Sequence, residues 1–201
     1  MTARLILKFP DKRLRGNSDP VTDDEYETNV NQWCQDLRDT MVANAGLGLA
    51  GPQIGIKKKI FAVDVKDLDN PGAFLQEPKD GVLYVINPVL SLVEKETHGS
   101  VEACFSVPGV MYKVKRSPVI DLSYITPQKQ SISVRIVGED AVVIQHEYDH
   151  LVGKLFIDRL NPFDKKQFAK LHKVPKKEKS EEEINQLREQ RRAKARAKRK
   201  K

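Results

Sequence analysis

Residues 146–150, with the sequence His-Glu-Tyr-Asp-His, combine residue types and a spacing that suit metal chemistry. Residues four apart share one face of a helix, so the imidazoles of His146 and His150 can bind one metal ion. Glu147 follows the first imidazole and could act as a general base. Apolar neighbours on both sides favour a buried polar face, which needs a partner such as a metal. The alternative is a polar turn that faces solvent.

A catalytic site for a zinc-type metal uses three protein ligands and leaves one position for water. The candidates for the third ligand are Cys104, His98, His172 or a carboxylate. We expect a turn at Val107-Pro108-Gly109, just after Cys104, and a metal beside this thiol would deprotonate it. Cys104 could instead be a packed core residue. His98 is expected in a surface turn, and His172, among lysines, is expected to face solvent.

Residues 46–55, Gly-Leu-Gly-Leu-Ala-Gly-Pro-Gln-Ile-Gly, form a third unusual segment. Glycines allow a backbone to approach a ligand closely. The segment is a poor phosphate loop, because it lacks the Gly-Lys-Ser/Thr ending and follows a helix. It could be a simple connection between a helix and a strand. Its single polar side chain, Gln53, suggests contact with a substrate.

The apolar pattern collects strands in the middle of the chain with a helix at each side, which predicts an α+β fold. Thr22 and Glu25 form a potential capping box, and a single amphipathic helix should run from there to Met41. Cys34 lies beside the apolar stripe of this helix and is expected to be buried. A long loop is expected at 66–81, and the helix with the histidines at 139–152. Strands are expected at 59–65, 83–86, 89–93, 119–124 and 131–136.

The excess positive charge of the 201-residue chain lies at its C-terminal end. Residues 173–201 contain 13 Lys and Arg against 5 Asp and Glu, a net charge of +8, whereas the whole chain carries +7. We therefore expect a near-neutral domain at 1–172 and a basic extension at 173–201 that prefers an anionic surface. Within this extension, residues 181–199 should form a helix that projects into solvent, because only two of their side chains are large and apolar.

The cysteine count and the apolar runs indicate the cellular compartment in which the protein is expected. Two cysteines do not make a disulfide framework, and a reducing environment would leave them as thiols or metal ligands. No run of 18 apolar residues is present, so we expect no membrane span. The apolar run Leu5-Ile6-Leu7 is too short for a signal peptide, which favours the cytoplasm.

Taken together, three segments resemble the peptide deformylase family. This family has a Gly-x-Gly-x-Ala-Ala-x-Gln segment, a Glu-Gly-Cys-Leu-Ser segment and a His-Glu-x-x-His segment in this order. They correspond here to residues 46–53, 102–106 and 145–150, and the wider resemblance covers about residues 5–160. The resemblance implies antiparallel strands around a central metal-binding helix, and it identifies Cys104 as the third ligand, beside the two histidines.

The resemblance implies hydrolysis of the formyl amide at the N-terminus of a newly made polypeptide, which releases formate. Glu147 would be the general base. The side-chain amide of Gln53 and the backbone N–H of Phe105 would stabilise the oxyanion. Members of the family typically use Fe²⁺, and Ni²⁺, Co²⁺ or Zn²⁺ can replace it. Ligand types alone do not choose among these metals.

The resemblance also implies how the formylated peptide binds. Leu47 and Gly48 would pair with its backbone, and Val142 and Val143 would line the pocket for the methionine side chain. Glu102 is expected to pair with Arg116.

Three residues depart from the family pattern, and two of them lie where the substrate backbone would pass. Ala103 and Phe105 replace a glycine and a leucine, so they put substrate preference in question more than reaction type. Gly51 replaces an alanine.

Two alternatives belong to other functional classes. The first is a zinc endopeptidase, which also uses His-Glu-x-x-His, although a cysteine ligand upstream argues against it. The second is an RNA- or ribosome-binding protein with a structural metal, suggested by the basic residues near the C-terminus. The deformylase and ribosome hypotheses are compatible, because an enzyme acting on nascent chains would benefit from residues 180–201 binding near the exit tunnel. A freely solvated tail is the simpler explanation of these charges.

Overall fold

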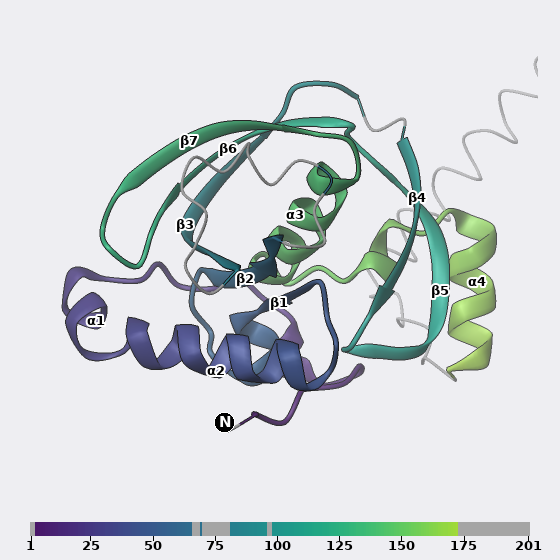
Figure 1. Ribbon diagram of the computed structural model, residues 1–201. Coiled ribbons are helices and arrows are strands. Elements are labelled where there is room, and N and C mark those ends of the chain that lie inside the picture. The colour runs from purple at the N-terminus through teal and green to yellow at the C-terminus, as the bar shows by residue number, and fades with distance from the viewer. Residues whose placement is uncertain (1–2, 66–68, 70–80, 96–97, 173–201) are drawn as a thin grey trace, which may run out of the picture. The chain divides into compact units, whose positions relative to one another are not determined.

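In the part of the chain that the structure describes, the strands form an antiparallel five-stranded sheet and a separate two-stranded sheet, so the fold is α+β as predicted (Figure 1). The computed structural model describes residues 3–65, 69, 81–95 and 98–172. Most of the loop predicted at 66–81 and all of the helix predicted at 181–199 lie outside these residues. Among the described residues, no helix is long and apolar enough to cross a membrane.

The five-stranded sheet has the order β1-β2-β3-β6-β7, and the smaller sheet pairs β4 with β5. The strands are β1 (Gly48–Ala50), β2 (Ile60–Asp64), β3 (Val82–Leu92), β4 (His98–Cys104), β5 (Val107–Arg116), β6 (Val119–Ile125) and β7 (Ser131–Val137). The α-helices are α1 (Asp23–Thr28), α2 (Val30–Ala43), α3 (Gly138–Leu151) and α4 (Pro162–Leu171). Short 3₁₀ helices are η1 (Lys12–Leu14), η2 (Gly51–Ile54) and η5 (Phe156–Arg159).

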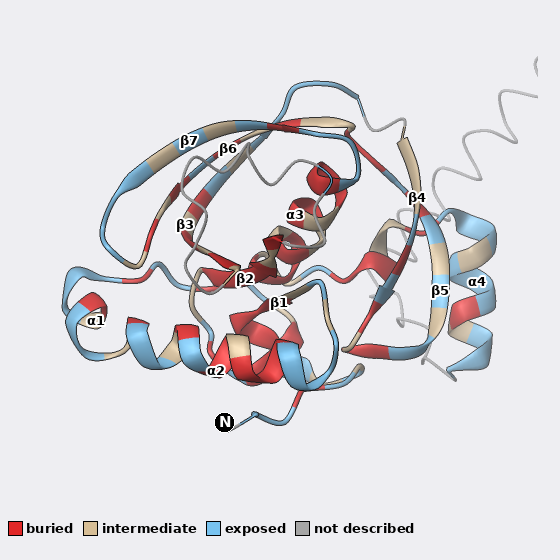
Figure 2. Cartoon of the chain, viewed as in Figure 1, coloured by how far each residue is buried: buried red, intermediate tan, exposed pale blue. Residues whose placement is uncertain are grey.

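Strand β2 is buried on both faces because a helix covers each side of the sheet at this point. Phe61 and Val63 face a core shared with α3, whereas Ile60 and Ala62 face a core shared with α2. Figure 1 shows the sheet curving over α3, and Figure 2 shows that α2 buries one face and exposes the other. A strand with two covered faces reads as a continuous apolar run. This packing fixes α3 against the centre of the sheet.

The predicted helix from Thr22 to Met41 is divided in two. The capping box is present, since the Thr22 backbone N–H donates to Glu25 Oε2 at 2.9 Å. However, Asn29 leaves helical geometry with φ −126°, which ends α1 and starts α2. The apolar spacing continues across this break, so the pattern alone could not reveal it. Cys34 is buried, as predicted.

The two strands predicted at 83–86 and 89–93 are one strand, β3, with an irregularity where the register shifts between Ile86 and Val89. Asn87 occupies the irregular position with φ +49°. Its side chain accepts a hydrogen bond from the Val21 N–H and donates one to the Val21 carbonyl, both at 2.8 Å. A polar residue in left-handed geometry thus replaces the predicted break.

The hairpin of β4 and β5 was not predicted from the sequence. Cys104 pairs with Val107, so Phe105 and Ser106 form its turn. The turn expected at residues 107–109 is therefore wrong, because these residues begin β5. His98, expected in a surface turn, begins β4. Two charged residues that are buried in these strands, Glu102 and Arg116, interrupt the apolar alternation. The sequence pattern therefore did not indicate the strands.

The chain divides into two compact units, Met1–Lys165 and Lys166–Lys201. In the second unit, His172 is exposed, as expected, and its ring stacks on Phe168 with ring centroids 4.1 Å apart. The predicted boundary between residues 172 and 173 stays a prediction.

The departure at Gly51 has a steric reason in this fold. A Cβ atom at Gly51 would lie 2.8 Å from the Ile56 carbonyl oxygen and 3.1 Å from Ile60 Cγ2. We predict that Gly51→Ala, although it restores the family residue, lowers the free energy of unfolding by about 1–3 kcal/mol through overpacking. Urea unfolding measures the change, and a loss below about 0.5 kcal/mol would contradict the prediction.

Candidate metal centre

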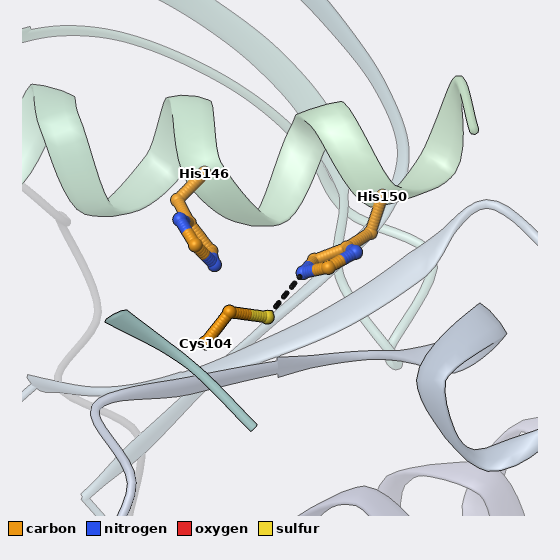
Figure 3. A group of neighbouring side chains, drawn as sticks. All are labelled: Cys104, His146 and His150. Carbon is orange, nitrogen blue, oxygen red and sulfur yellow. Dashed lines mark hydrogen bonds between the residues drawn. The ribbon is translucent and has the colours of Figure 1, made fainter. Parts of the chain in front are cut away.

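Cys104, His146 and His150 come together at one point between β4 and α3 (Figure 3). Their potential ligand atoms all lie within 4.8 Å of one another, and Cys104 Sγ is 3.4 Å from His150 Nε2. Tetrahedral coordination with ordinary zinc bond lengths would separate sulfur and nitrogen by about 3.6 Å. The sequence prediction that these three residues converge is confirmed, and the group could hold a metal ion.

The two imidazoles differ in how their second ring nitrogens are held. His146 Nδ1 lies 2.7 Å from Glu102 Oε2, which leaves Nε2 to face the cluster. A carboxylate that fixes a ligand histidine in this way is usual at metal sites. His150 Nδ1 is buried and has no hydrogen-bond partner among the described residues. A thiolate with two imidazoles suits a divalent transition metal, so the residues present fit the cofactor that the sequence predicts.

Electrostatics favour the thiolate form of Cys104. Burial raises the pKa of this thiol, but the charge of His150 and hydrogen bonds from both histidines bring the pKa well below its usual value. For His146, burial lowers the pKa, but hydrogen bonds with Cys104 and Glu102 bring the pKa well above its usual value. A deprotonated sulfur is the form that binds a metal.

Glu147 lies on the same helix and directs its carboxylate at the Gly-rich segment. A Cβ atom at Gly48 would lie 2.6 Å from Glu147 Oε1, so only glycine admits the carboxylate here. Glu147 Oε2 is buried without a partner among the described residues. Burial raises the pKa of Glu147 to about 7, although the charges of His146 and His150 oppose the shift. A carboxyl group with this pKa can both accept and return a proton near neutral pH.

Gln53 is fixed by its own segment. The Ala50 N–H donates to Gln53 Oε1 at 2.8 Å, so the amide nitrogen is the atom that faces the cluster. This nitrogen lies 3.2 Å from Ser106 Oγ and 3.5 Å from Cys104 Sγ. The amide of Gln53 is therefore a positioned donor beside the potential metal ligands.

The N-terminal segment holds the two loops of the site together, a role that sequence reasoning missed. The Leu7 N–H donates to the Gln53 carbonyl and the Phe9 N–H to the Ser106 carbonyl, both at 2.7 Å. Between them, Lys8 Nζ donates to the Phe105 carbonyl at 2.6 Å. These are largely backbone contacts, so no side-chain motif could have revealed them.

A cleft of about 910 Å³ opens beside the cluster and is lined by most of the predicted site residues. The predicted residues at its walls are Leu47, Gly48, Gln53, Ala103, Cys104, Phe105, Val142, Val143, His146 and Glu147. His150 lies deeper, with 2% of its surface exposed. His98, an alternative ligand, pairs instead with Glu139 at 2.6 Å.

The two departures that line the cleft differ in orientation. The ring of Phe105 lies against Gly46, where a Cβ atom would overlap its edge. Ala103 is exposed, while the residues on either side of it along β4 are buried. Its methyl group is therefore on the outer face of the strand.

Arg116 forms a buried ionic network behind the ligands, and its extent was only partly predicted. It binds Glu102 through Nε at 2.7 Å and Nη2 at 2.8 Å, which confirms the expected pair. Its Nη1 also binds Asp149 at 2.5 Å, and Asp149 accepts a further hydrogen bond from Arg159 Nη2 at 2.7 Å. Burial raises the pKa of Glu102, but hydrogen bonds from Arg116 and His146 lower it to about 2. Glu102 is thus a stable anion that orients His146.

The fold and this cluster define a class, namely α+β proteins in which a cysteine and two helical histidines could hold a metal next to a buried carboxylate. The model of the family described as polypeptide deformylase matches residues 3–166. The peptide deformylase of Buchnera aphidicola subsp. Cinara cedri is 38% identical over 161 residues, which cover 80% of this chain and 100% of that protein. The peptide deformylase of Rickettsia akari is 38% identical over 78% of this chain and 86% of the relative.

Solved structures agree with the sequence relatives. The peptide deformylase of Ehrlichia chaffeensis, solved in complex with actinonin, has a TM-score of 0.71 and 31% identity, over 90% of this chain and all of that one. The peptide deformylase of Thermotoga maritima has a TM-score of 0.70 and 31% identity, over 81% of this chain and all of that one. The chain belongs to the peptide deformylase family, which favours a deformylase over an endopeptidase.

The Arg116 network yields a stability prediction. Arg116→Met removes a charged partner from two buried carboxylates, Glu102 and Asp149, and we expect it to lower the free energy of unfolding by about 3–5 kcal/mol. Arg135→Met is the matched control, because Arg135 binds Asp121 at 2.7 Å in an exposed ion pair and its loss should cost less than about 1 kcal/mol. Denaturant unfolding of both variants measures the two changes, and equal decreases in the free energy of unfolding would contradict the prediction. Exchanging Arg116 and Glu102 should not rescue folding, because a glutamate at position 116 would face Asp149.

Proposed function

We propose that the protein hydrolyses the formyl amide at the N-terminus of formyl-methionine in new polypeptides and releases formate. The observation that carries this proposal is the convergence of Cys104, His146 and His150 next to a cleft that Glu147 and Gln53 line. In a member of the deformylase family, this arrangement supplies a metal site, a proton-transfer group and a hydrogen-bond donor together.

Cys104, His146 and His150 would hold one divalent metal ion, and such an ion supplies Lewis acidity and lowers the pKa of a bound water to about 7. Glu147 takes a proton from the attacking water and later gives it to the departing amine. Its position next to His146 and its pKa of about 7 support both transfers. Gly48 keeps the space in front of Glu147 free of a side chain.

The negative charge that develops on the formyl oxygen requires donors that are already in place. The amide nitrogen of Gln53 is one, since Ala50 fixes its orientation. The backbone N–H of Phe105, in the hairpin turn, is the second. Leu7, Lys8 and Phe9 hold these two donors relative to each other through the hydrogen bonds described above. Loss of one such donor commonly costs about 10²–10³ in rate.

The walls of the cleft suit a peptide whose first side chain is apolar. Leu47 and Gly48 lie on one side and offer backbone groups to the peptide, and Val142 and Val143 form an apolar wall on α3. Ala103 and Phe105 both line the cleft, but Ala103 adds only an exposed methyl group, so it should alter peptide binding less than the ring of Phe105.

Fe²⁺ is the metal we propose, with Ni²⁺, Co²⁺ or Zn²⁺ as substitutes, on the basis of the family resemblance. The proposed setting is the cytoplasm, where a free thiolate survives. Residues 180–201 would bind ribosomal RNA or proteins near the exit tunnel. The dense positive charge of this segment supports the proposal that it binds the ribosome.

Formate release from a formyl-methionyl peptide tests the reaction. The wild-type protein, prepared without oxygen and loaded with Fe²⁺, should release formate, whereas Glu147→Gln should be slower by about 10²–10⁴, because the isosteric amide cannot take the proton. Metal analysis of both proteins is the control, and each should contain one ion per chain. Full activity of the variant would exclude Glu147 as the base, and a metal-loaded but inactive wild-type protein would refute the proposed function.

Sedimentation with ribosomes tests the role of the basic segment. Deletion of residues 180–201 should weaken binding to ribosomes but leave the turnover of short formyl peptides unchanged. Binding of the full-length protein should fall with salt, with a slope of about 0.7–0.9 per phosphate contacted. Equal ribosome affinity of the truncated and full-length proteins would rule out this segment as the binding element.

A further inference from the structure

The cleft continues away from the potential metal ligands as a trough between β4 and α3. On α3, Glu139 and His146 both line the cleft and are separated by seven residues, or about 10 Å along the helix axis. Val142 and Val143 lie between them. Along β4, Cys104 lies near the reaction centre and Ser100 near the other end. A side chain that starts at the metal site and follows the valines therefore points towards Glu139 and Ser100.

This far end of the trough is polar. Glu139 Oε1 lies 2.6 Å from His98 Nε2, and Glu139 Oε2 accepts a hydrogen bond from Ser100 Oγ at 2.9 Å. The three residues thus bridge the start of α3 to the start of β4. Hydrogen bonds from His98 and Ser100 lower the pKa of Glu139, so the bridge is anionic on the side of Glu139.

Two other carboxylates that line the cleft, Asp140 and Glu102, are bound by other groups. Asp140 Oδ1 accepts the Asp69 N–H at 2.8 Å, and both oxygens of Glu102 bind Arg116. Glu139 also has interactions on both oxygens, but its side chain is 53% exposed. Each carboxylate oxygen can accept two hydrogen bonds, so Glu139 can accept another from a ligand in the trough.

We propose that Glu139 determines specificity for the first side chain of the formylated substrate. The tip of an unbranched side chain, lying along Val142 and Val143, meets the carboxylate of Glu139 and the hydroxyl of Ser100. The pocket therefore accepts a tip that donates hydrogen bonds, such as the amide of glutamine, in addition to methionine. It rejects the acidic tip of glutamate by charge repulsion. This inference rests on the proposed function and concerns the substrate class of the same site.

Three peptides that differ only in the first residue test the proposal, namely formyl-methionyl, formyl-glutaminyl and formyl-glutamyl peptides, because these side chains have similar lengths. In the wild-type holoenzyme, kcat/KM should be higher for glutamine than for glutamate by about tenfold or more. In Glu139→Leu, the ratio of glutamine to methionine should fall about three- to tenfold, which is the effect of one lost hydrogen bond. In the same variant, kcat/KM for the glutamyl peptide should rise relative to the glutaminyl peptide, because the negative charge of Glu139 is removed.

Ratios measured on one preparation do not depend on the fraction of enzyme that is folded, so a destabilised variant remains informative. Asp121→Leu is the matched control, since it removes an exposed carboxylate that pairs with Arg135 and should leave the ratios unchanged. Unchanged ratios in Glu139→Leu would overturn the inference alone. Absence of formate from all three peptides would overturn the proposed function, and the inference with it.

Discussion

The site depends most on the buried ion pairs that the guanidinium of Arg116 forms with Glu102 and Asp149. The guanidinium is fully buried and joins Glu102 on β4 to Asp149 on α3. Glu102 in turn holds His146, so the ion pair and the orientation of a potential ligand form one connected network. A buried charge of this kind adds little net stability, but its loss takes a hydrogen-bonded cation away from two buried carboxylates, Glu102 and Asp149. The network therefore specifies how the hairpin sits on the helix, and the sulfur of Cys104 reaches the imidazoles as a consequence.

Close backbone approach is the second constraint. The carboxylate of Glu147 fits only because Gly48 has no side chain, and the ring of Phe105 lies where Gly46 has none. The glycines of the segment are thus required by different neighbours on different elements. The N-terminal residues add backbone hydrogen bonds to both loops. A site built in this way depends on the whole domain, because its parts come from the N-terminus, the first loop, the hairpin and the central helix.

The α+β class and the helix carrying the histidines could be predicted from the sequence, because they rest on periodicity and on a motif that acts locally. The convergence with Cys104 could be predicted only through the resemblance to the family, because the residues alone left several candidates for the third ligand. The hairpin of β4 and β5 could not, since Glu102 and Arg116 are charged residues buried in strands. Their burial is stable only because they bind each other and Asp149, and such pairing is a property of the tertiary structure. The break at Asn29 and the continuity of β3 through Asn87 were missed for a similar reason, since single-residue backbone geometry leaves the apolar pattern unchanged.

The departures from the family motifs separate chemistry from substrate recognition. Cys104, His146, His150, Glu147 and Gln53 keep the family residue types, and they lie around the proposed point of reaction. Gly51 is enclosed by the backbone around Ile56 and Ile60, so its change is matched by local packing. Ala103 and Phe105 lie at the walls of the cleft, where a substitution alters shape but leaves the ligands and the donor of Gln53 in position. The same reasoning applies to the polar end formed by Glu139, His98 and Ser100, because it lies about two helical turns from His146. Residues at that distance can change which side chain is accepted without changing the reaction.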